Sequence, residues 1–75
     1  MAEIKNLTIK EEFIKLDAAL KLAGFVGTGG HAKMAIQEGM VKVNGEVCLQ
    51  RGKKLRLGDE AIFDGNTLVI KNAGQ

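Results

Sequence analysis

The segment from residue 16 to residue 45 constrains the fold of this chain most, because it joins helical spacing, glycine stops and a hairpin turn in one run. Apolar residues recur at helical spacing in its first part, which predicts a short helix over about residues 16–24 with one buried face. Asp17 is expected either to cap this helix or to favour its dipole. Gly24 stands where the helix would end in a left-handed residue.

A second helix is expected after the glycine-rich turn. Thr28 is a suitable cap, because its hydroxyl accepts a hydrogen bond from the first helical turn. Ala32, Ala35 and Ile36 give this helix a thin face of small residues, which allows two helices to pack closely. Gly39 supplies the stop.

Strand signals follow the second helix. Lys42 alternates with two valines, and Asn44-Gly45 is the strongest short hairpin signal in the chain, because a type I′ turn needs positive φ at both central residues. The N-terminal residues 1–15 show no single period, and we expect a frayed segment that leads into an edge strand ending near Phe13 and Ile14. The other strands are expected near residues 41–44, 46–49, 60–64 and 67–71.

The order of these elements resembles the RNA-binding domain of ribosomal protein S-four, the αL fold. The resemblance covers about residues 15–64 and lies in Leu16-Asp17, the leucine-rich helix ending at Gly24, Ala32-Lys33 with Ile36, Gly39 followed by Val41-Lys42-Val43-Asn44-Gly45, and Leu57-Gly58-Asp59. The chain also looks like the small stand-alone bacterial members of that family, the YaaA/YbcJ type. The resemblance implies an α+β fold with two short helices packed on a small, mostly antiparallel sheet.

Length and composition set further bounds. Seventy-five residues allow one domain, expected over residues 1–75 with a core of about 15–71. No apolar run is long enough to span a membrane, and no signal peptide is expected. A lone cysteine, Cys48, fits a reducing compartment, so we expect a cytoplasmic protein. No large apolar stripe is evident, which favours a monomer.

The charge is small but unevenly distributed. The net charge is +2, yet residues 15–56 hold eight basic and three acidic residues, whereas the rest of the chain holds three basic and six acidic ones. This pattern suits a surface that faces phosphates, although a solvated lysine face would look the same. Four cations between residues 50 and 56 form the densest cluster.

The resemblance implies binding to structured RNA, either ribosomal or transfer RNA, with a ribosomal subunit or its precursor as a further partner. The expected RNA-binding residues are Lys15, Lys21, Thr28, His31, Lys33, Lys42, Arg51, Lys53, Lys54 and Arg56. Many family members carry a Ser-Arg pair at the start of the second helix, where this chain has Thr28-Gly29-Gly30, so one charged contact is missing. The glycine-rich turn itself is either plain turn geometry or an anchor for an RNA phosphate.

We expect no enzyme, cofactor or metal site. His31 has no neighbouring nucleophile and is either an exposed helix-start residue or a phosphate or ribose contact. Cys48 is expected to be a small buried hydrophobe, and the methionines at 34 and 40 to fill the core. Three core-like phenylalanines, at 13, 25 and 63, offer no platform for base stacking, which favours recognition of a folded or double-helical RNA through its backbone.

The sequence also allows two other classes of function. One is a protein-interaction module or a ubiquitin-like sulfur carrier, although such carriers end in Gly-Gly and this chain ends in Asn72-Ala73-Gly74-Gln75. The other is an accessory to an RNA-modifying enzyme or a synthetase, acting in trans.

Overall fold

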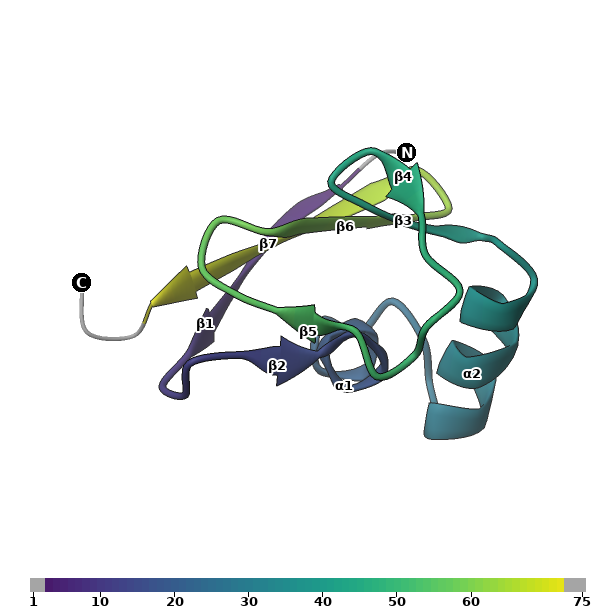
Figure 1. Cartoon of the computed structure of the whole chain (residues 1–75), viewed down its shortest axis with the longest axis horizontal. Helices are drawn as coiled ribbons and strands as arrows, with labels where there is room; N and C mark the ends of the chain where they lie inside the picture. The colour runs from purple at the N-terminus through teal and green to yellow at the C-terminus, as the bar shows by residue number, and fades with distance from the viewer. Residues whose placement is uncertain (1–2, 73–75) are drawn as a thin grey trace.

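The structure is a computed structural model and describes residues 3–72. Most strands of a five-stranded sheet cross the upper part of the view in Figure 1, its first strand runs down to the lower left, and two helices and a two-stranded ribbon lie in the lower part. In chain order, the elements are β1 (Ile4–Ile9), β2 (Ile14–Lys15), α1 (Leu16–Leu22), α2 (Gly29–Gln37), β3 (Val41–Val43), β4 (Glu46–Val47), β5 (Lys54–Leu55), β6 (Glu60–Phe63) and β7 (Asn66–Asn72). The α+β class and the two helices on a mostly antiparallel sheet are therefore confirmed.

The sheet has the strand order β1-β7-β6-β3-β4, and only the β1–β7 pair is parallel. Two-residue turns join β3 to β4 and β6 to β7. Asn44 and Gly45 have φ values of 52° and 87°, and Asp64 and Gly65 have 52° and 79°. Positive φ at both central residues is what a type I′ hairpin requires, so the hairpin predicted at Asn44-Gly45 is confirmed.

One hydrophobic cluster joins the layers. Alternate residues of β3, β6 and β7 are buried against the helices, which is the period-2 pattern of a sheet with one covered face. The largest fully buried side chains are Leu16, Leu20, Ile36, Val41, Leu55, Leu68 and Ile70. Leu55 comes from the ribbon, so the ribbon is packed into the same core as the helices.

The helix boundaries follow the predicted signals closely. The Thr28 hydroxyl accepts a hydrogen bond from the His31 amide at 3.0 Å, which confirms the cap of α2. The first helix ends at Leu22, and Gly24 follows with φ 79°, as expected for a left-handed stop. Asp17 does not cap α1, because Lys15 holds the N-cap position and Asp17 lies in the first turn, where its charge favours the dipole.

The prediction of a frayed N-terminus was wrong, because residues 4–9 form β1. The inward positions of this strand are Lys5, Leu7 and Ile9, and the first of them is charged. The Lys5 ammonium donates to the Ala23 carbonyl oxygen at 2.8 Å and so closes the C-terminal end of α1. A lysine at an inward position hid the strand period. The short strand expected near Phe13 and Ile14 is β2.

Several core assignments were also wrong. Met34 is 60% exposed, because α2 buries its alanines and Ile36 on another side, and Met40, in the link between α2 and β3, is 51% exposed. Cys48 is half-buried and packs against the core, so the expectation for it is met in part, and its thiol donates to the Gln50 carbonyl oxygen at 3.6 Å. Phe63 is buried and Phe25 packs against the core, but Phe13 lies outside the hydrophobic cluster.

Within residues 3–72, no helix has the length and apolar character that a membrane span needs. In the same range, no three histidine, cysteine, aspartate or glutamate side chains gather as a metal site would need. Most of the chain end compared above with sulfur carriers, residues 73–75, lies outside the described range.

Candidate functional site

The β2–β5 ribbon has one apolar face and one cationic face. Its register pairs Ile14 with Leu55 and Lys15 with Lys54. Leu55 is fully buried and Ile14 packs against the core, whereas both lysines are exposed. Directly opposed residues of an antiparallel pair lie on the same face, so the ribbon holds two ammonium groups side by side on its outer surface.

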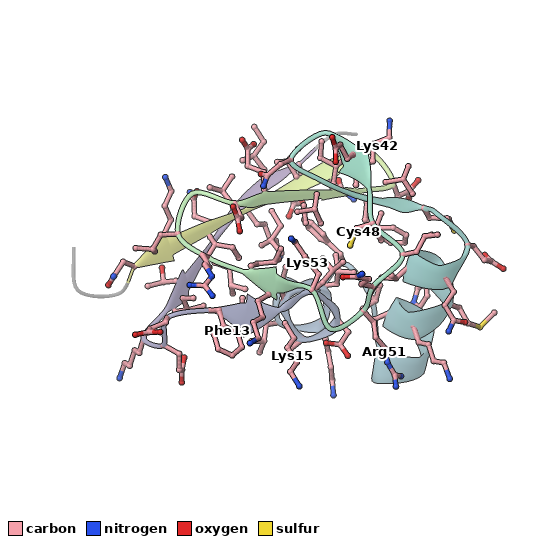
Figure 2. The ribbon with its side chains drawn as sticks, viewed as in Figure 1. Phe13, Lys15, Lys42, Cys48, Arg51 and Lys53 are labelled. Atoms are coloured by element: carbon pink, nitrogen blue, oxygen red, sulfur yellow. The ribbon has the colours of Figure 1, made fainter. Side chains whose placement is uncertain are left out.

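An aromatic ring lies on the same outer surface. Phe13 precedes Ile14, so strand alternation places it on the side of Lys15. The Lys54 ammonium lies 4.8 Å from the centroid of the Phe13 ring, which is a cation–π contact. Figure 2 shows Phe13 and Lys15 along one side of the molecule, at the bottom of the view.

The turn from Gln50 to Lys53 brings a third cation to this side. The Lys53 amide donates to the Gln50 carbonyl oxygen at 3.1 Å and closes the turn. The first two amides of α1 then donate to the turn, Leu16 to the Lys53 oxygen at 2.8 Å and Asp17 to the Arg51 oxygen at 3.2 Å. Figure 2 shows Arg51 at the bottom of the view with Lys15. We call Phe13, Lys15, Arg51 and Lys54 the ribbon patch.

The cations of the ribbon patch have no carboxylate partner among residues 3–72. In that range the one ion pair is between Lys5 and Glu3, 3.6 Å apart, in and beside β1. Like charges directly opposed across a ribbon repel each other. The ribbon patch is therefore a place where a polyanion would relieve repulsion that the protein itself leaves in place.

Two further predicted cations lie beside the ribbon patch. The Lys53 side chain lines an open hollow under the β3–β4 hairpin together with Cys48, and both are near the centre of Figure 2. Arg56 lines a second hollow that also holds Glu11 and Glu12. This mixed charge makes Arg56 a poorer phosphate ligand than the lysines of the ribbon.

Lys42 is not brought together with the ribbon patch. Its neighbours Val41 and Val43 are buried, so Lys42 lies on the sheet face that is turned away from the helices. Figure 2 shows it at the top of the view, on the opposite side from Lys15 and Arg51. A single RNA surface that includes both groups would have to wrap around the molecule.

The remaining predicted residues lie on the helices and are exposed. Lys21 is in the last turn of α1 and Lys33 is in α2. Thr28 already uses its hydroxyl as the cap. His31 is exposed in the first turn of α2, and its ring packs edge-on against Phe63 with centroids 6.1 Å apart.

A cluster of hydrogen bonds that the sequence did not reveal joins the β3–β4 hairpin turn to the Leu57-Gly58-Asp59 turn. Asn44 donates to the Asp59 carboxylate at 3.2 Å and accepts from the Glu60 amide at 3.0 Å. The same carboxylate accepts from the Arg56 amide at 2.8 Å. We call this cluster the Asn44–Asp59 clasp. The signal was present, because both residues belong to the motifs quoted above, but their contact across fifteen positions was not visible.

Comparisons with known proteins agree with this geometry. The model of the S4 domain family matches residues 7–71. The "Probable ribosome maturation protein RlbA" of Bacillus subtilis (strain 168) is 41% identical over 59 residues, which cover 79% of this chain and 83% of that protein. YbcJ of Escherichia coli (strain K12) is 36% identical over 61 residues, covering 81% of this chain and 87% of YbcJ.

A solved structure matches as well. The solution structure of YbcJ from Escherichia coli, reported to reveal an αL motif involved in RNA-binding, superposes with a TM-score of 0.69 at 33% identity. The match covers 88% of this chain and 85% of that one. The family model matches most of the chain and a relative is 41% identical over 79% of it, so this chain belongs to the S4 domain family.

Proposed function

We propose that this protein binds structured RNA, ribosomal or transfer RNA, and that it does so without catalysing a reaction. The observation that carries the proposal is the pair of exposed lysines, Lys15 and Lys54, opposed on the ribbon with no carboxylate partner in the described chain. The names of two relatives support it, since one refers to ribosome maturation and the other's structure refers to RNA binding.

The binding mode follows from the kind of groups available. Ammonium and guanidinium groups at the ribbon patch contact phosphate oxygens, which fix position but carry no sequence information. About five phosphate contacts are available if the three cations of the ribbon patch, Lys15, Arg51 and Lys54, are joined by Lys53 and by one further exposed cation such as Lys33 of α2. The logarithm of the binding constant should then fall with the logarithm of salt concentration with a slope of about −4 to −5.

We also propose that the protein acts in the cytoplasm as a monomer. The support for the first point is the single cysteine, which is free and half-buried in the structure. The support for the second is that the sequence shows no large apolar stripe.

The test is a binding titration of the full chain with ribosomal RNA hairpins and a DNA duplex of matched length, repeated over a series of salt concentrations. We expect RNA to bind more tightly than DNA, with the salt slope given above. Equal affinity for both nucleic acids would mean that the surface binds polyanions in general and does not distinguish RNA. No binding to either at low salt would contradict the proposal and leave a protein partner as the alternative.

A further inference from the structure

Phe13 is the phenylalanine that the core does not use. Phe63 is buried and Phe25 packs against the cluster, so both contribute to the fold. Phe13 is partly exposed and lies outside that cluster, and the ammonium of Lys54 is 4.8 Å from the centroid of its ring. Leaving an aromatic ring on a cationic surface is unusual in a domain with only three aromatic side chains.

The contact between Lys54 and the ring is weak enough to be exchanged. A cation over a partly exposed ring favours the contact by about two- to five-fold. A nucleobase stacked on an aromatic side chain favours binding by about five- to 150-fold. A base that reaches the ring would therefore displace the ammonium. The released Lys54 would stay beside Lys15, on the side where the phosphates of that nucleotide must lie.

We propose that Phe13 stacks one unpaired nucleobase while Lys15 and Lys54 hold the phosphates on either side of it. This inference rests on the proposed function and specifies its ligand as a paired RNA stem interrupted by an unpaired nucleotide. Opposed residues of an antiparallel pair have Cβ atoms about 4.5–5.5 Å apart, so two long lysine side chains can spread to successive phosphates. A single ring accommodates one unpaired base, so the patch discriminates a bulged stem from an uninterrupted duplex.

The stacking surface is held in place before RNA arrives. The inner face of the ribbon is anchored by Leu55, which is fully buried. The turn after residue 50 is tied to the first turn of α1 by the hydrogen bonds of Leu16 and Asp17. Binding therefore orders few protein groups beyond the lysine side chains.

The experiment compares two RNA hairpins that differ only in one unpaired nucleotide within the stem. The full chain should bind the bulged hairpin about five- to 20-fold more tightly than the paired one. Phe13→Leu should bring this ratio down to about one, and Phe13→Tyr should restore it. Met34→Ala is the matched control, because it truncates an exposed apolar side chain outside the ribbon patch, and it should keep the wild-type ratio.

A direct readout of stacking accompanies the affinities. With 2-aminopurine as the unpaired nucleotide, wild-type protein should change its fluorescence on binding, and Phe13→Leu should not. Equal affinity of the wild type for the two hairpins, or an unchanged 2-aminopurine signal in the bound state, would overturn the inference alone. Absence of binding to both hairpins would overturn the proposed function together with it. Thermal melting of each variant shows that the protein compared is folded.

Discussion

The ribbon patch and the Asn44–Asp59 clasp differ in whether their polar side chains find partners within the protein. In the clasp, Asn44 and Asp59 bond to each other and to backbone amides, so a turn rich in polar atoms is satisfied within the protein. In the ribbon patch, Lys15 and Lys54 stand opposed, and neither has a carboxylate partner in the described chain. One region uses its polar groups for the fold, and the other leaves them for a ligand. Substitutions in the two regions should therefore affect different measurements.

The largest effect is expected on the inner side of the ribbon. Leu55→Ala removes a fully buried side chain next to Lys54 and should lower the free energy of unfolding by about 2–5 kcal/mol. A domain of this size has a free energy of unfolding of about 4–11 kcal/mol, so the substitution would remove a large part of its stability. Urea unfolding measures the change. A loss below about 1 kcal/mol would mean that the ribbon is not packed into the core.

The second effect is on binding. Lys15→Glu with Lys54→Glu removes two phosphate contacts, each of which contributes about eightfold at 0.1 M salt relative to 1 M. RNA affinity at 0.1 M salt should fall by about 60-fold or more, because the new carboxylates also repel phosphate. Titration against an RNA hairpin measures it.

Its matched control is the pair Lys10→Glu and Lys71→Glu, which changes the net charge equally but outside the ribbon patch. We expect the control to lose less than about fivefold in RNA affinity, because it changes only the long-range electrostatic field of the protein. If the two double variants lose affinity equally, net charge rather than the patch governs binding.

A third effect concerns the clasp. Asn44 and Asp64 hold the same position in two equivalent turns, each with φ 52°, but only Asn44 belongs to the clasp. Asn44→Ala should therefore cost about 1–2 kcal/mol more of unfolding free energy than Asp64→Ala, since it loses two side-chain hydrogen bonds. Chemical denaturation of the two variants gives the difference. Equal losses would show that the clasp adds nothing beyond the turn conformation.

The smallest expected effect on stability is that of Lys15→Glu, which should raise the stability of the fold while it weakens RNA binding. Lys15→Glu alone replaces two opposed like charges by an opposite-charge pair, and should stabilise the fold by about 0.2–1 kcal/mol at low salt. The same variant should bind RNA about tenfold or more weakly. The neutral variant Lys15→Gln removes the repulsion from Lys54 without adding an attraction, so comparing it with Lys15→Glu separates the two contributions. A destabilised Lys15→Glu protein would contradict the idea that the opposed lysines of the ribbon lower the stability of the fold and are present to bind RNA.

The sequence predicted the fold where local chemistry and tertiary packing agree. The Thr28 cap, the left-handed Gly24 and the Asn44-Gly45 hairpin each follow from the residue itself. It failed where a side chain serves a distant element. Lys5 points inward because it closes the end of α1, which broke the strand pattern of β1.

The candidate site could be predicted only in part. The sequence located the cations but not their neighbours, so Lys42 was grouped with Lys15 although the sheet separates them. No strand was predicted at residues 54–55, because a strand of two residues is too short to show a period, and its pairing with β2 joins residues at least 39 positions apart. Phe13 was assigned to the core because exposure cannot be deduced from residue type.

The most direct test of the account is a map of backbone amide shifts in NMR spectra of the full chain as an RNA hairpin is added. We expect the shifts to concentrate at residues 13–16 and 51–55, which form the ribbon patch and the turn beside it. The clasp and the outer face of the sheet around Lys42 should change little. Shifts centred on Lys42 and its neighbours in β6, with the ribbon unaffected, would contradict the claim that the ribbon patch is the surface that faces RNA.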